Sequence, residues 1–99
     1  KDDTNLKENF IENFLKENYF RIEAKEKKEK GILYLASINL EKITLQIECF
    51  YFYKKTTQSE LIKFYTSSMK PKIVFIEKCP KSLIKFADTI DNFEVIDIN

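Results

Sequence analysis

The segment from Gly31 to Lys55 consists of two runs of alternating apolar residues separated by the short polar stretch "NLEK". Alternation with a period of two places every second side chain on the same face of a strand, so the runs predict strands over Gly31–Asn39 and Lys42–Tyr53. The two-residue link "LE" permits only antiparallel neighbours, because a parallel connection needs a dozen or more residues. The segment therefore predicts a β-hairpin against which the rest of the chain must pack.

The remaining elements follow from the spacing of apolar residues along the chain. A helical stripe runs from Leu6 to about Asn18, the next run "YFRIEA" alternates as a strand, and the charged stretch Lys25–Lys30 predicts a solvated turn. After the hairpin, the capping-box sequence "TQSE" opens a helix, "KPKIVFIEK" predicts a buried strand, Pro80 suits the start of another helix, and "FEVIDI" forms a last strand. The order α-β-β-β-α-β-α-β predicts an α/β fold with a mixed sheet. We expect this sheet to be antiparallel at the hairpin and parallel towards the C-terminal strands, with helices on both faces.

Length and composition limit the organisation of the chain and its partners. The 99 residues, 43% of them hydrophobic, fit a single domain that folds without metals or disulfides. The chain starts at Lys1 rather than Met, which indicates a piece of a longer protein. A net charge of +1 gives no long-range attraction to polyanions, so any nucleic-acid contact must depend on a local patch. No apolar run reaches the roughly 20 residues that span a bilayer, so we expect this segment to make no membrane contact.

Cysteine and histidine content argues against a structural metal. The chain has two cysteines, Cys49 and Cys79, and no histidine, so it lacks the ligands of a zinc site. Cysteines in such a setting are more often small buried apolar residues than disulfide partners. This favours a reducing compartment, and we expect a cytoplasmic location.

Two stretches of the hairpin carry a family resemblance. The first, "GILYLA", begins at Gly31, and the second, "ITLQIE", ends at Glu48. They are similar in pattern and spacing to the Gly-Ile-Asp-apolar-apolar-Ala strand and the apolar run ending in Gln-x-Lys of the type IV restriction, Mrr-like, branch of the restriction endonuclease-like (PD-(D/E)xK) fold. The opening helix, with Glu8 at a position that is sometimes acidic in that family, and the ending "KIVFIEKCPKSLIKFADTIDNFEVID" also resemble it. The resemblance spans nearly the whole chain and implies a restriction endonuclease-like fold.

The same resemblance implies a nuclease site that this sequence does not complete. In the family, an Asp on the second strand and an acid or Gln on the third hold a divalent metal, and a Lys on the third strand assists the attacking water. Here Leu33 stands at the Asp position and Glu48 at the Lys position, so that only Gln46 is kept. A neutral amide alone is a poor ligand for Mg²⁺. We therefore expect Glu8, Leu33, Gln46 and Glu48 to be remnants of a decayed site, with no catalytic residue, metal or cofactor.

The surviving role expected of such a domain is binding. Lys54 and Lys55 follow the aromatic run "FYFY" and are the candidates for contact with DNA phosphates, although such a run is more often core packing. The other expected partner is a protein, such as another domain of the parent chain. DNA binding predicts lysines clustered beside Gln46 in space, whereas a pure protein-interaction module predicts an exposed apolar patch.

An active metal-dependent DNA endonuclease with non-standard ligands remains a further alternative. It would need Mg²⁺ held by residues such as Glu8, Glu41 and Glu48 around Gln46. On a strand face, charged side chains are usually solvated instead, and Gln46 and Glu48 are then expected on the wet side of a half-covered sheet.

Overall fold

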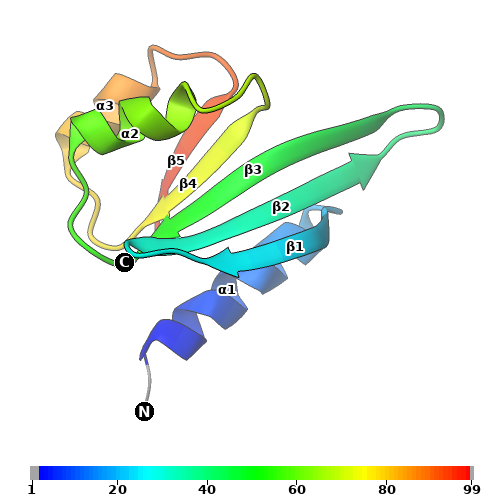
Figure 1. Cartoon of the computed structure of the whole chain (residues 1–99), viewed down its shortest axis with the longest axis horizontal. Coiled ribbons are helices and arrows are strands. Elements are labelled where there is room, and N and C mark those ends of the chain that lie inside the picture. Colours follow the sequence, from blue (N-terminus) through cyan, green and yellow to red (C-terminus); the bar gives the residue numbers. More distant parts are fainter. Residues whose placement is uncertain (1–2, 99) are drawn as a thin grey trace.

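A computed structural model describes residues 3–98 and shows the α/β fold expected from the sequence (Figure 1). Its elements follow the predicted order: α1 (Asp3–Glu17), β1 (Arg21–Lys27), β2 (Gly31–Asn39), β3 (Thr44–Phe52), α2 (Gln58–Tyr65), β4 (Lys72–Ile76), α3 (Lys81–Ala87) and β5 (Phe93–Asp97). The strands form one five-stranded sheet in the order β1-β2-β3-β4-β5. The first two pairings are antiparallel, and β3, β4 and β5 run parallel to one another. The predicted mixed sheet is thus confirmed.

The β2–β3 hairpin has the register that its alternating pattern requires. It pairs Gly31 with Phe52 at one end and Asn39 with Thr44 at the other. The third strand is shorter than predicted because the amide of Leu40 donates to the carbonyl of Ile43, which closes the turn before the ladder begins. Gly31 is required by close packing, since a Cβ atom there would collide with the carbonyl oxygen of Tyr51 and lie 2.9 Å from its carbonyl carbon.

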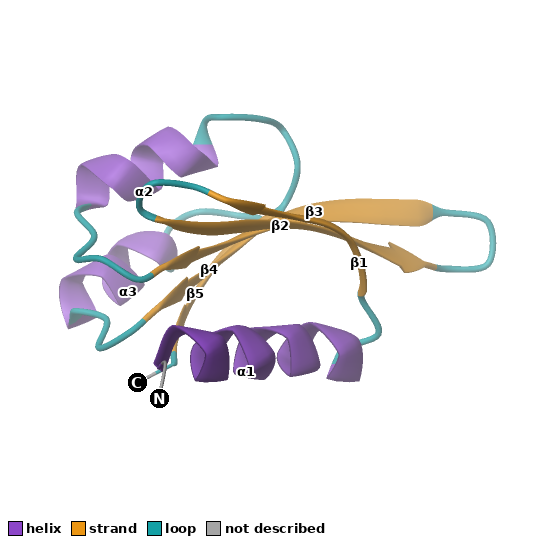
Figure 2. Ribbon diagram, turned by 60° about the horizontal axis from the view of Figure 1, so that its bottom comes forward, coloured by secondary structure: helices purple, strands orange, loops and turns teal. Residues whose placement is uncertain are grey.

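Helices cover both faces of the sheet, as Figure 2 shows. The face under α1 holds one core cluster: Ile11, Leu15, Ile32, Tyr34, Ala36, Ile47, Cys49, Tyr51, Phe75 and Ile98. The face under α2 and α3 holds the other: Phe52, Leu61, Val74, Ile76, Cys79, Leu83, Ala87 and Phe93. Alternate residues of β3 therefore point into different cores. None of the helices within residues 3–98 is long and apolar enough to cross a membrane.

The charged stretch after residue 24 differs from its prediction. Instead of a turn over Lys25–Lys30, β1 continues to Lys27 and pairs with β2, and only the following three residues form the turn. The strand tolerates its charges because it is the edge of the sheet, where exposed charged side chains also discourage pairing with other chains. Its outward residues are solvated, and Lys25 instead faces α1.

The two cysteines behave as the composition predicts. Both Cys49 and Cys79 are buried and unpaired. Burial raises the pKa of the Cys49 thiol to about 12, so it is not a reactive thiolate at neutral pH.

Candidate nucleic-acid interface

The four positions expected to be remnants of a nuclease site lie on different faces of the sheet. Leu33, Gln46 and Glu48 share the face that carries α2, since Leu35 is paired with Glu48 and Ser37 with Gln46 in the hairpin register. Glu8 lies on α1, against the opposite face, where it contacts Lys25. The sheet therefore separates Glu8 from Glu48, and the fold does not bring these carboxylates together around Gln46.

Glu48 is not solvated as expected but is part of a buried polar cluster. Its side chain is 15% exposed, and its Oε1 accepts from the Ser68 hydroxyl at 2.9 Å and lies 3.4 Å from Nζ of Lys72. Lys72 is 2% exposed, and its Nζ also donates to Oγ and the carbonyl of Ser68 and to the carbonyl of Lys70, at 2.8–2.9 Å. These hydrogen bonds and the ion pair connect the segment between α2 and β4 to the middle of β3. We call this arrangement the Lys72 clamp.

The residues at the remnant positions do not fit a divalent metal. Leu33 offers no donor atom, Gln46 offers a neutral amide, and the carboxylate of Glu48 already serves as the counter-ion of Lys72. Mg²⁺ requires near-octahedral oxygen coordination and is usually held through carboxylates. Across residues 3–98, no three acidic or cysteine side chains gather in a geometry that would hold a metal ion.

A second polar cluster lies between α1 and the sheet. Lys25 donates to Glu8 at 2.7 Å and to Glu12 at 2.9 Å, and the Tyr34 hydroxyl donates to Glu12 at 3.0 Å. Burial raises the pKa of the Glu12 carboxyl, but hydrogen bonds from Lys25 and Tyr34 outweigh it and hold that pKa below its ordinary value. Hydrogen bonds that Lys25 donates to the carboxylates of Glu8 and Glu12 raise the pKa of Lys25. Oε2 of Glu8 is buried with no hydrogen-bond partner among the described residues.

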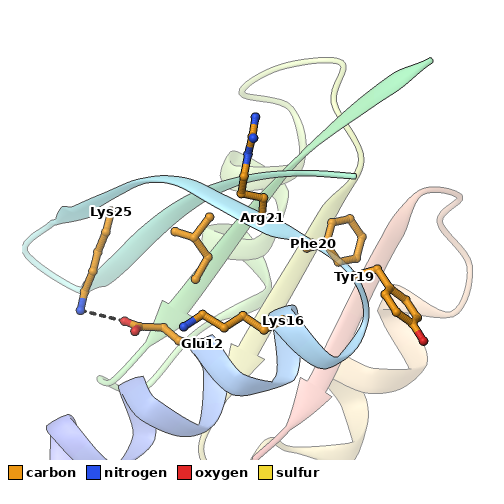
Figure 3. Close-up of a pocket in the computed structure, with 7 residues that line it drawn as sticks. Glu12, Lys16, Tyr19, Phe20, Arg21 and Lys25 are labelled. Atoms are coloured by element: carbon orange, nitrogen blue, oxygen red, sulfur yellow. Dashed lines mark hydrogen bonds and ion pairs between the residues drawn. The ribbon is translucent and has the colours of Figure 1, made fainter. Parts of the chain in front are cut away.

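This cluster borders a cavity of about 630 Å³ between α1 and β1. Figure 3 shows Lys25 reaching from β1 to Glu12, with Lys16 beside the pair, whereas the side chains of Arg21 and Tyr19 point away from it. Arg21 is itself paired with Glu23 at 3.0 Å. The charges in this cavity therefore largely compensate one another, which makes it a poor receptor for a polyanion.

The two lysines proposed from the sequence lie at the carboxyl ends of neighbouring parallel strands. Lys54 and Lys55 follow β3, and together with Lys78, which follows β4, they line a cavity of about 430 Å³. All three are exposed. Glu77 also lines the cavity, and its carboxylate is 3.5 Å from Nζ of Lys7. We call Lys54, Lys55 and Lys78 the lysine cluster; it is the least compensated group of cations at any of the cavities described.

The lysine cluster is not beside Gln46, as a DNA-binding remnant site would predict. Gln46 and Lys54 are eight positions apart on an extended segment, which corresponds to roughly 26 Å at about 3.3 Å per residue. Lys72 does lie near the remnant face, but no sequence pattern distinguishes it, and it is buried in the clamp.

The exposed apolar patch expected of a protein-interaction module is also present. Leu40, Ile43 and Leu45 lie at the free end of the β2–β3 hairpin, with exposed fractions of 59%, 62% and 43%. Figure 1 shows this end of the hairpin extending beyond the helices that cover the sheet.

Comparisons with known proteins add no relative: neither a protein-family model, nor a curated protein, nor a solved structure matches this chain.

Sequence reasoning missed Lys78, Lys72 and the Lys25 cluster. The topology offers a signal for Lys78, since residues that follow adjacent parallel strands meet at one edge of the sheet. For Lys72 and Lys25 the sequence carries no such signal, because their partners are distant and their spacing is not periodic.

Proposed function

We propose that this chain is a restriction endonuclease-like domain of the Mrr-like branch that has lost its metal site and now binds nucleic acid without cutting it. The observation that carries this proposal is the lysine cluster, in which three exposed lysines from two separate strand ends surround one cavity. Lysines placed in this way contact phosphates and hold the backbone without reading sequence. The two buried thiols, unprotected by a disulfide, support a reducing, cytoplasmic setting.

The inactive part of the proposal is supported by chemistry at the remnant positions. The alkyl side chain of Leu33 stands at the position of the family's metal-binding carboxylate, and the carboxylate of Glu48 lies 3.4 Å from Nζ of Lys72. The negative charge of Glu48 stands where the family has a positive one, so it repels rather than steadies charge that develops on a phosphate. An active nuclease with other ligands is the alternative that a cleavage assay decides.

The binding part is tested by titrating a labelled DNA duplex at about 50 mM and about 200 mM salt. Each neutralised phosphate adds about 0.9 to the slope of log affinity against log salt, so the lysine cluster should give a slope of about 2.7. The Lys54→Ala, Lys55→Ala double variant should lower this slope by about 1.8. The matched control is Lys42→Ala with Lys85→Ala, which removes the same charge from two exposed lysines elsewhere. Absent binding at the lower salt, or equal effects of the two double variants, would contradict the proposal.

A second role, contact with a protein or with another domain of the parent chain, is favoured by the apolar end of the hairpin. Leu40, Ile43 and Leu45 are exposed together there, and such groups mark interaction surfaces. Light scattering over a range of concentrations tests whether copies of this chain associate through it. Leu40→Ser with Ile43→Ser should abolish any such association, and an association that persists in this variant would place the contact elsewhere.

A further inference from the structure

A groove of about 400 Å³ lies on the sheet face that carries α2, next to the lysine cluster. Its floor is formed by Phe50 and Phe52 of β3 and Phe64 of α2, and its rim by residues of the turn between β1 and β2 and of α2: Lys28, Glu29, Lys30, Glu60 and Lys63. Phe50 is the register partner of Leu33, so the groove adjoins the position where the family has its metal-binding Asp. We call it the aromatic groove.

The floor of the aromatic groove presents aromatic rings at the surface. The ring of Phe50 is 4.4 Å from that of Phe52 and 5.6 Å from that of Phe64, measured between centroids. Phe52 is buried, whereas Phe50 and Phe64 are partly exposed. Since every nucleobase has a π face, the accessible parts of the Phe50 and Phe64 rings offer stacking surfaces that do not depend on sequence.

The rim of the groove carries three lysines, and two of them already have acidic partners. Lys30 pairs with Glu60, and Lys28 lies 3.2 Å from a carboxylate oxygen of Glu26. Lys63 is exposed on α2 beside the partly exposed Phe64. The rim therefore supplies a weak local excess of positive charge next to an aromatic floor, which suits a planar group that carries a phosphate.

The aromatic groove and the cavity of the lysine cluster are neighbours that share one lining residue. Phe52 lines both of them, and the amide of Tyr53 donates to the carbonyl of Lys30 at 3.2 Å, which joins the rim of the groove to the end of β3. A chain of nucleotides that contacts Lys54 and Lys55 can thus extend along this face over Phe50. The two sites offer the two kinds of contact that single-strand binding surfaces combine, charge and stacking.

We propose that the aromatic groove binds unpaired bases of single-stranded nucleic acid by stacking them on Phe50 and Phe64, while the lysine cluster holds the adjoining backbone. This inference rests on the proposed function and narrows its ligand class. In a duplex each base face is covered by its neighbours, so only an unpaired base can place its ring on the floor of the groove. The domain should therefore prefer single strands over duplexes of the same sequence.

The test compares three fluorescently labelled DNA ligands of equal length: a thymidine single strand, a duplex and an abasic single strand that keeps the phosphates. Anisotropy titrations at about 50 mM salt should give tighter binding to the thymidine strand than to the other two. Stacking of one base typically corresponds to roughly 5- to 100-fold in affinity. We expect Phe50→Leu to lose a factor in this range on the thymidine strand and to leave binding of the abasic strand unchanged.

Control variants separate loss of the ring from loss of the fold. Phe50→Tyr keeps a stacking face and should retain the affinity, and Phe10→Leu removes an exposed ring from α1, on the other side of the sheet. Thermal unfolding identifies any variant that fails to fold, in which case Phe64→Leu replaces Phe50→Leu in the comparison. Equal affinity for thymidine and abasic strands, preference for the duplex, or equal effects of Phe50→Leu and Phe10→Leu would overturn the inference and leave the proposed function standing. Absence of binding to all three ligands would overturn both.

Discussion

The Lys72 clamp gives the sharpest stability prediction, because a buried charge depends on four neighbouring acceptors. Replacing Lys72 with Met keeps most of the side-chain volume and removes Nζ. The change leaves the carbonyls of Ser68 and Lys70 without the donor Nζ, and each lost hydrogen bond lowers the free energy of unfolding by about 1 kcal/mol. It also leaves Glu48 without a counter-ion, and breaking one side of a buried ion pair typically costs about 3–5 kcal/mol.

The expected loss lies at the lower end of that range. The side chain of Glu48 retains 15% exposure and its hydrogen bond from the Ser68 hydroxyl, so it recovers part of its solvation once Lys72 is gone. We therefore expect Lys72→Met to lower the free energy of unfolding by about 3 kcal/mol. For a domain of this size, whose total stability is about 5–15 kcal/mol, that is a large fraction.

Urea unfolding followed by circular dichroism at neutral pH measures this change. With an m-value of about 1–2 kcal/mol/M, the midpoint should fall by roughly 1.5–3 M. Lys70→Met is the matched control, since that side chain is exposed and should change stability by less than about 0.5 kcal/mol. Glu48→Met with Lys72→Met should be more stable than Lys72→Met alone, because no charge is then left buried. A loss below about 1 kcal/mol for Lys72→Met would refute the clamp as described.

Three further outcomes are expected. Incubation with duplex or single-stranded DNA in Mg²⁺ or Mn²⁺ should give no cleavage beyond a heat-killed control; cleavage that disappears in Glu48→Ala or Gln46→Ala would establish the active-nuclease alternative. Tyr19→Gly should raise the free energy of unfolding by about 0.5–1 kcal/mol, because Tyr19 lies in the turn that follows α1, with a φ of 70° and an 83% exposed side chain; Tyr19→Ala, which keeps the strain, should give no such gain when both variants are measured by thermal unfolding. Because the pKa of Glu12 is lowered in the folded state, its ionised carboxylate should stabilise the protein at pH values above the ordinary pKa of 4.5, and this stabilisation should be lost as the pH falls through the folded-state pKa. Glu12→Gln should therefore flatten the dependence of the urea midpoint on pH below about 5. An unchanged dependence would show that Glu12 has the same pKa in the folded and unfolded states.

The order of elements was predictable because each one has a local signal. The alternation of Gly31–Asn39 fixes both the strand and its buried face, and the two-residue link leaves an antiparallel partner as the only choice. In the second half, helices long enough to return the chain demand parallel neighbours, which β3, β4 and β5 confirm. These signals act within a few residues, so a single sequence is sufficient to read them.

The polar clusters were not predictable because they depend on contacts between distant segments. Lys25 belongs to a run that reads as a solvated turn, yet it is held in β1 by pairing with Tyr34 and by two carboxylates of α1. Glu48 reads as a solvated residue of a half-covered sheet, and only the parallel register that pairs it with Lys72 reveals its role. A lysine in a strand pattern gives no indication of whether its partner is water or a carboxylate.

The fold also places the Lys72 clamp and the lysine cluster at opposite ends of the parallel strands. The Lys72 clamp lies at the start of β4, whereas Lys54 and Lys78 lie beyond the opposite ends of β3 and β4. The clamp has no exposed cation to offer a ligand, since Lys72 is 2% exposed, and the lysine cluster has little buried structure to lose. Substitutions in the clamp should therefore lower the urea midpoint and leave the affinity of the folded protein for DNA unchanged. Substitutions in the lysine cluster should weaken DNA binding and leave the urea midpoint unchanged. If Glu48→Gln weakened DNA binding in the folded protein, the ligand would have to reach the remnant face itself, and the proposed interface would need to extend along the whole of β3.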